Sequence, residues 1–121
     1  MVLTTHREDI EKWFPEDHPA YLSVDNNQAL LLKLDGNFVE AKRMFERVSQ
    51  QYAKFYGDNH PSSINALINL ATVMKDLNEN EEAIPIFERA LEGRRLTEGE
   101  NSINFAMAKA MAAGALRDAG D

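Results

Sequence analysis

The chain has 121 residues, which suits one domain, and its formal net charge of −7 gives a pI near 4.9. That charge offers no overall field to attract nucleic acid or an anionic membrane, so neither is expected as a partner. The absence of cysteine excludes disulfides, thiolate nucleophiles and cysteine-ligated zinc. No stretch approaches the roughly 20 apolar residues of a membrane helix, and the first eight residues lack the apolar run of a signal peptide. We therefore expect a cytoplasmic protein with no membrane insertion.

An internal repeat of 42 residues organises the chain. His18-Pro19 recurs as His60-Pro61, and this shift aligns the rest without a gap. The run 45–47 (Phe-Glu-Arg) matches 87–89, and a second step of 42 reaches the end of the chain. An ungapped register of this kind is typical of a repeat architecture, in which each unit packs on its neighbours.

In chain order, the pattern predicts helices over about 19–34, 38–56, 61–76, 80–97 and 103–119. Pro19 and Pro61 suit a first helical turn, where their missing N–H is not needed, and the residues before them can cap it. Pro85 is expected near the start of its helix, with a slight kink. Residue types that tolerate a left-handed backbone stand at three equivalent helix ends, namely Gly36, Asn78 and Gly120.

Small residues at repeated positions predict that the helices approach closely in antiparallel pairs. Three alanines recur in the middle of the first helix of each pair, at Ala29, Ala71 and Ala113. Two more lie on the second helix, at Ala41 and Ala83, each followed four residues later by Phe45 or Phe87 on the same face. The fold class predicted from these positions is all-α.

With its 42-residue period and the run from Asn80 to Arg95, the chain resembles the tetratricopeptide repeat, in the variety found in kinesin light chains. The resemblance implies a right-handed superhelical solenoid of antiparallel helix pairs. It divides the chain into 1–17 (the end of a preceding repeat), repeats 18–59 and 60–101, and 102–121 (the first helix of a further repeat). We therefore expect a piece of a longer array, whose exposed terminal repeat faces favour self-association.

The same resemblance implies a protein–protein interaction module, an adaptor or scaffold, with a concave groove lined by the first helix of each pair. An extended or acidic peptide of a partner protein would lie in it. The peptide-binding residues carried over from the family are Asn27, Asn69, Lys33, Lys75, Asn65, Thr72 and Arg117. The two asparagines can both donate to and accept from a peptide backbone. The cations Lys33, Lys75 and Arg117 form a row that would attract acidic segments.

The chain departs from the family pattern in two places. Asp25 and Gln28 replace apolar residues in the first predicted helix, which should weaken packing there. Met111 stands where the earlier units have asparagine, so hydrogen bonding to a peptide backbone should not continue beyond Asn69.

Two other interpretations stay open. Cations in the last turn of a helix also stabilise its dipole, and Asp76 and Asp118 could neutralise two of them. The repeats could alternatively serve as a structural spacer or self-association element of a larger multidomain protein. No catalytic motif, phosphate-binding loop, metal-ligand spacing or cofactor site is found, so an enzyme is not expected.

Overall fold

The computed structural model describes residues 20–120, where the regular secondary structure consists of helices joined by short loops. The helices are α2 (Ala20–Leu34), α3 (Phe38–Tyr56), α4 (Pro61–Asp76), α5 (Asn80–Glu98) and α6 (Ile103–Gly120). The all-α prediction is confirmed, and α3 and α4 have the predicted bounds while α5 and α6 each run one residue further. The predicted end of a preceding repeat, 1–17, lies outside the described residues.

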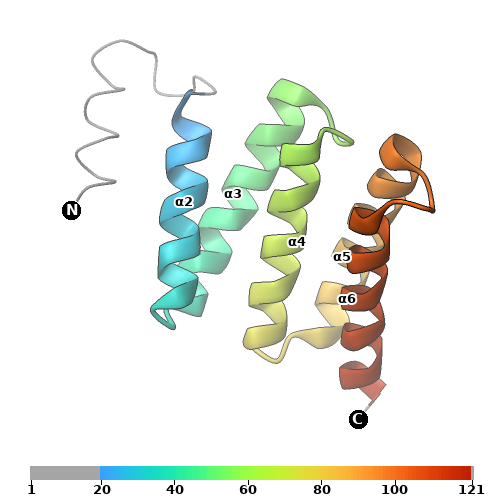
Figure 1. The fold of residues 1–121 in the computed structure, drawn as a ribbon. Helices are drawn as coiled ribbons and strands as arrows, with labels where there is room; N and C mark the ends of the chain where they lie inside the picture. The colour runs from blue at the N-terminus through green and yellow to red at the C-terminus, as the bar shows by residue number, and fades with distance from the viewer. Residues whose placement is uncertain (1–19, 121) are drawn as a thin grey trace.

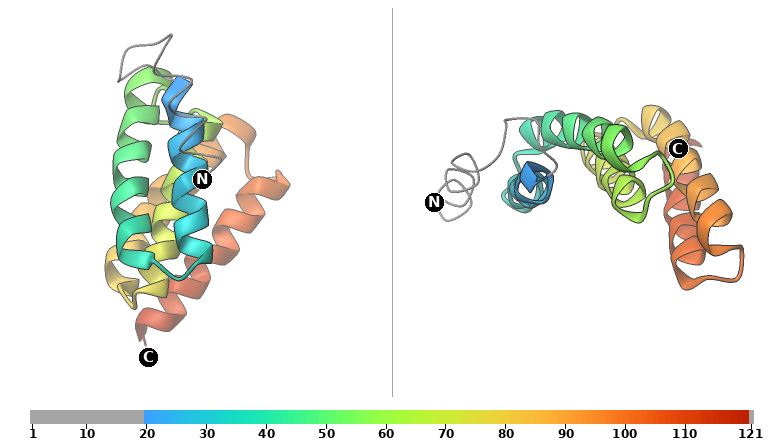
Figure 2. Two further views of the ribbon diagram at one scale, coloured as in Figure 1. Left: turned by 90° about the vertical axis from the view of Figure 1, so that its left-hand side faces the viewer. Right: turned by 90° about the horizontal axis from the view of Figure 1, so that it is seen from above.

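Successive helices pack as antiparallel neighbours, α2 on α3, α3 on α4, α4 on α5 and α5 on α6 (Figure 1). Seen from above, α2, α4 and α6 occupy one side of a curved array, and α3 and α5 occupy the other (Figure 2). The array is therefore two layers of helices. We call the layer made of α2, α4 and α6 the A-helix row.

Local chemistry explains where α4 begins and where α2 and α4 end. The His60 side chain accepts a hydrogen bond at Nδ1 from the backbone N–H of Ser62 (3.1 Å), and Pro61 occupies the first turn, as predicted. Gly36 and Asn78 follow the helices with φ of 83° and 63°, in the left-handed region that glycine and asparagine tolerate. Gly120 differs from its predicted role, because it remains helical as the last residue of α6.

The repeated alanines and phenylalanines form the centre of the core. Ala29, Ala41, Ala71 and Ala83 are fully buried, and Phe45 and Phe87 are the largest side chains to be buried almost completely. Small residues on facing helices bring the backbones together, and each ring fills the space beside them. This arrangement is the one that the sequence pattern predicts.

Ala113 does not share the environment of Ala71, its equivalent in the preceding unit. It is exposed, whereas its neighbours Ala108, Ala112 and Ala115 are buried. The reason is that α5 covers only one face of α6, and no described helix packs on the face that holds Ala113. The prediction of a packed alanine at 113 therefore fails for this structure.

Two glycines inside helices have opposite surroundings and provide a test of the packing. A Cβ added at Gly93 in α5 would lie 2.8 Å from Cδ1 of the fully buried Ile64, which has little space to move. A Cβ at Gly114 in α6 would meet nothing nearer than the flexible Lys75 ammonium at 3.5 Å.

Gly93→Ala should therefore lower the free energy of unfolding by about 1–2 kcal/mol, because overpacking outweighs the gain in helix propensity. Gly114→Ala should raise it by up to about 1 kcal/mol, since alanine loses less backbone entropy than glycine in a helix. Urea denaturation of the two variants measures both. Equal effects of the same sign would contradict the described contact between α4 and α5.

Candidate functional site

The residues predicted to bind a peptide lie on the three helices of the A-helix row. Asn27 and Lys33 are on α2, and Asn65, Asn69, Thr72 and Lys75 are on α4, with Arg117 on α6. The helices are in contact across the row, since α2 packs on α4 and the Lys75 ammonium reaches Asp118 of α6 at 3.3 Å. Residues one repeat apart therefore stand side by side.

Among the predicted polar, uncharged residues, Asn27 and Asn69 have side chains that are available to a ligand. Asn27 is exposed and Asn69 is half-buried, and neither amide forms a side-chain hydrogen bond within residues 20–120. Each can offer a donor and an acceptor to a bound backbone. Their role in binding stays a prediction, and it is compatible with their surroundings.

Asn65 and Thr72 are already engaged inside the protein. The Arg94 guanidinium donates to Asn65 Oδ1, and the Thr72 hydroxyl donates to the carbonyl of Ile68 one turn earlier (2.7 Å). A ligand that used Asn65 would have to share it with Arg94. These two residues are thus less suited to binding than the asparagines at 27 and 69.

The three predicted cations are not equivalent. Lys75 is half-buried and paired with Asp118 of the following repeat, so one of the two acids considered from the sequence does neutralise a cation, but not the cation beside it in the sequence. Within residues 20–120, Lys33 and Arg117 form no ion pair. The positive charge available to a ligand therefore lies near the C-terminal ends of α2 and α6, with a neutralised pair between them.

A buried arginine connects α4, α5 and α6, and sequence reasoning did not identify it. Arg94 is 6% exposed and, besides bonding Asn65, it donates from Nη1 to Glu98 Oε2 at 2.9 Å. The Asn104 amide of α6 donates to the other oxygen of Glu98 at 2.7 Å. The Arg94 Nε is buried without a partner in the described residues, so the arginine depends on these two acceptors. The repeat alignment could have pointed to this residue, because the charged Arg94 stands where the preceding unit has the aromatic Tyr52.

Asp25 has a structural partner that explains its presence in an apolar position. Its side chain is 5% exposed, and Oδ2 accepts from Nη2 of Arg47 on α3 at 2.9 Å. The expected weakening of packing at this position is therefore offset by a charge-assisted bond between α2 and α3.

The A-helix row becomes apolar at α6. Met111, at the position of Asn27 and Asn69, is 38% exposed, and Met107, one turn earlier, is 57% exposed. Thioether side chains adapt to varied apolar groups. The part of the row formed by α6 can thus contact an apolar side chain, whereas α2 and α4 present amides.

The described residues offer little else for chemistry. Residues 20–120 contain no group of three or more histidine or acidic side chains placed to hold a metal ion. None of the helices in that range is both long and apolar enough to cross a membrane. Two cavities border α4: one is lined by residues of α3, α4 and α5, and the other by residues of the α3–α4 loop, α4 and α5.

The family model for the tetratricopeptide repeat matches residues 20–95. The chain belongs to the tetratricopeptide-repeat family. The fold agrees with a crystal structure described as kinesin light chain nearly identical TPR-like repeats from Podosopora anserina, with a TM-score of 0.87 at 21% identity. That match covers 98% of this chain and 56% of the other, and a single-substitution variant of the same protein gives 0.86. The resemblance to kinesin-light-chain-like repeats is thus confirmed at the level of fold.

Two relatives are similar in sequence, and both are called clustered mitochondria protein homolog. The one from Debaryomyces hansenii is 27% identical over 95 residues, and the one from Meyerozyma guilliermondii is 31% identical over 90. These matches cover 78% and 74% of this chain but only 7% of each relative. Tetratricopeptide repeats are generally protein–protein interaction modules and are typically non-catalytic.

The link from α5 to α6 makes stability depend on pH. The pKa of Glu98 lies below its ordinary value of 4.5, first because Asn104 donates a hydrogen bond to its carboxylate and second because Arg94 does. A carboxyl group with a lowered folded-state pKa stabilises the protein above its unfolded-state pKa, and this stabilisation is lost as pH falls through the folded-state value.

Glu98→Gln should therefore melt at a lower temperature than the wild type at pH 7, and the difference should shrink as the pH is lowered below about 4.5. Thermal melts followed by circular dichroism between pH 7 and pH 3 measure this. Glu81→Gln, an exposed position in the first turn of α5, is the control. A difference that stays constant with pH would show that the Glu98 charge has no part in the link.

Proposed function

We propose that this chain binds an extended peptide segment of a partner protein along the A-helix row. The observation that carries the proposal is the pair Asn27 and Asn69, one repeat apart on adjacent helices, whose amides have no partner within residues 20–120. An extended backbone presents a carbonyl and an N–H to each side, and an amide can bond both. The family assignment supports binding of proteins in general.

The chemistry of the row suggests the composition of the peptide. Acidic residues would be favoured near Lys33 and Arg117, which form no ion pair in the described residues. An apolar residue would be favoured over Met107 and Met111. Lys75 contributes less because its charge is shared with Asp118.

The test uses a random 12-residue peptide library displayed on phage, selected on the full chain, followed by titration of synthetic peptides from the selection. The double variant Asn27→Ala/Asn69→Ala should weaken their binding at least tenfold, because it removes the donor and the acceptor at two adjacent sites. Its melting temperature should stay close to that of the wild type, since neither amide bonds another part of the described protein.

Glu46→Ala, an exposed position on α3 in the other layer, is the matched control and should leave affinity unchanged. Selected peptides that bind the double variant as tightly as the wild type would reject the A-helix row as the binding site. A selection that yields no saturable peptide would reject peptide binding by this chain.

A second function, self-association, is favoured by one observation on α6. The residues of α6 that correspond to the α4 positions facing α5 are exposed, at Ala106, Ala110, Ala113 and Leu116. In α4 the same positions hold Ile64, Ile68, Ala71 and Met74, which α5 covers. A structural role in which this face meets another repeat is the alternative to peptide binding.

Sedimentation velocity over a range of concentrations distinguishes this alternative. Self-association through α6 should produce a sedimentation coefficient that rises with concentration and falls to the monomer value in Ala113→Glu, because a charge on a packed face is costly to bury. Lys109→Glu alters an exposed position of the same helix and should have a smaller effect if apolar contact dominates. A strict monomer at all concentrations would reject the alternative.

A further inference from the structure

Two arginines at equivalent repeat positions have different surroundings. Arg47 of α3 donates to Asp25 Oδ2 at 2.9 Å, and the carboxylate lies in a buried position of α2. A shift of one repeat leads from Arg47 to Arg89 of α5 and from Asp25 to Leu67 of α4. The second unit therefore has the guanidinium without the carboxylate.

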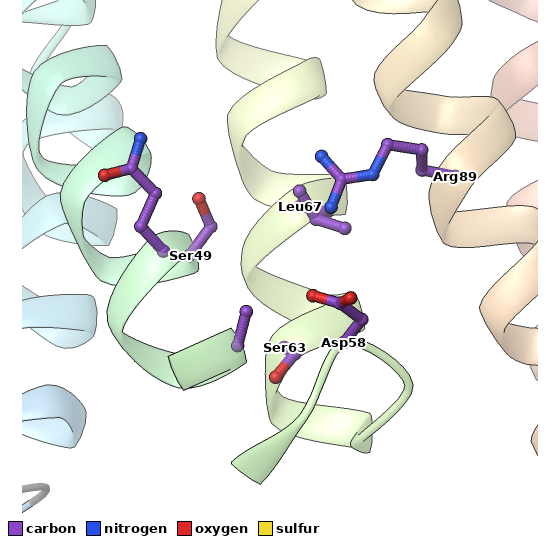
Figure 3. Close-up of a pocket in the computed structure, with 7 residues that line it drawn as sticks. Ser49, Asp58, Ser63, Leu67 and Arg89 are labelled. Atoms are coloured by element: carbon purple, nitrogen blue, oxygen red, sulfur yellow. The ribbon is translucent and has the colours of Figure 1, made fainter. Parts of the chain in front are cut away.

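Arg89 stands at the edge of a cavity rather than in an ion pair. Within residues 20–120 it forms no ion pair and no side-chain hydrogen bond. The cavity has a volume of about 270 Å³ and lies between α3 and α5 over the first half of α4. Its lining is Ser49, Gln50, Ala53, Asp58, Ser63, Leu67 and Arg89. Figure 3 shows the Arg89 guanidinium over Leu67, facing the space between the helices.

A second cavity extends from Arg89 along the C-terminal half of α5. This space of about 240 Å³ shares Asp58, Leu67 and Arg89 with the first and adds Asn59, Glu92 and Gly93. Arg89, which is exposed, thus borders both hollows. Neither hollow includes a residue of the proposed peptide-binding set on the A-helix row.

We propose that Arg89 binds the carboxylate of an aspartate or glutamate side chain of a partner polypeptide in this cavity. The ligand chemistry is taken from the first unit, where an aspartate side chain fills the corresponding place at Arg47. An arginine fork pairs well with a planar carboxylate, and the apolar wall at Leu67 keeps water from one side of the pair. This site shares α4 with the A-helix row but none of the proposed peptide-binding residues, and it does not depend on the function proposed for that row.

Asp58 determines how strong the binding can be. It lines both hollows and, in Figure 3, its carboxylate lies on the Arg89 side of the cavity, although no ion pair joins the two. Glu92 adds a second negative charge to the outer hollow. A ligand carboxylate is attracted by Arg89 and repelled by Asp58, so we expect a weak, millimolar contact for an isolated side chain. A doubly charged phosphate doubles both the attraction to Arg89 and the repulsion from Asp58 and Glu92, and because the acids outnumber the arginine the net effect is less favourable than for a carboxylate.

The experiment titrates the full, ¹⁵N-labelled chain with N-acetyl-glutamate N-methylamide at pH 6.5 and follows the arginine Nε–Hε signals by NMR. The Arg89 signal should shift saturably, while those of Arg47 and Arg43, which are paired with Asp25 and Glu40, should shift much less. Sodium chloride and inorganic phosphate at matched ionic strength serve as competitors of different chemistry. Neither should reproduce the saturable shift.

Three variants test the assignment. Arg89→Gln should abolish binding, detected then by the backbone signals of Ser63 and Leu67, and Asp58→Asn should tighten it roughly threefold to tenfold by removing the repulsion. Leu67→Asp should restore the pair of the first unit and exclude the ligand. If Leu67→Asp fails to fold, Arg89→Gln and Asp58→Asn are sufficient to test carboxylate binding at Arg89.

An Arg89 shift no larger than that of Arg43 would overturn the proposal. Binding seen only in Asp58→Asn would also overturn it, because Asp58 would then be the natural occupant. An equal response to chloride or phosphate would show non-specific anion pairing in place of a carboxylate site.

Discussion

The close approach of helices at paired alanines is the constraint on which the rest of this structure depends. Ala29 with Ala41, and Ala71 with Ala83, bring adjacent backbones together, and Phe45 or Phe87 then fills the remaining space. Because each helix contacts mainly the one before and the one after, the core is a chain of local contacts along the array. The spacing of side chains on the A-helix row, and hence the proximity of Asn27 to Asn69, is set by this packing.

The surface polar groups of the array differ from place to place, because some are used in ion pairs and hydrogen bonds between helices and others are not. On the A-helix row, several side chains are committed to contacts between helices, such as Lys75 with Asp118 and Asn65 with Arg94. Between the two layers, Asp25 pairs with Arg47 in one unit, whereas Leu67 stands opposite Arg89 in the next and leaves that guanidinium beside a cavity. Substitutions at single repeat positions therefore give equivalent places in successive units different polar groups and different potential ligands.

The sequence was sufficient for the elements whose signals are local or repeated. Pro61, His60, Gly36 and Asn78 act on the residues next to them, so the helix bounds could be predicted closely. It was insufficient where a side chain's state depends on a distant partner. Asn65 and Thr72 had the same prediction as Asn69, yet Asn65 bonds an arginine 29 residues away and Thr72 bonds its own helix. Ala113 matched Ala71 in sequence, but its burial requires a helix on the outer face of α6.

The unequal burial of the helices has a consequence for how the array opens and closes. α4 lies between α3 and α5 and contributes eight buried residues, whereas α6 has one packed face and contributes three. Local opening is easiest where few apolar groups are lost to water, so backbone amides of α6 should exchange with solvent well before those of α4. Within residues 20–120, α6 therefore opens more easily than α4. A partner that covers α6 would have to order that helix as it binds, and the entropy lost in doing so would offset part of the contact energy.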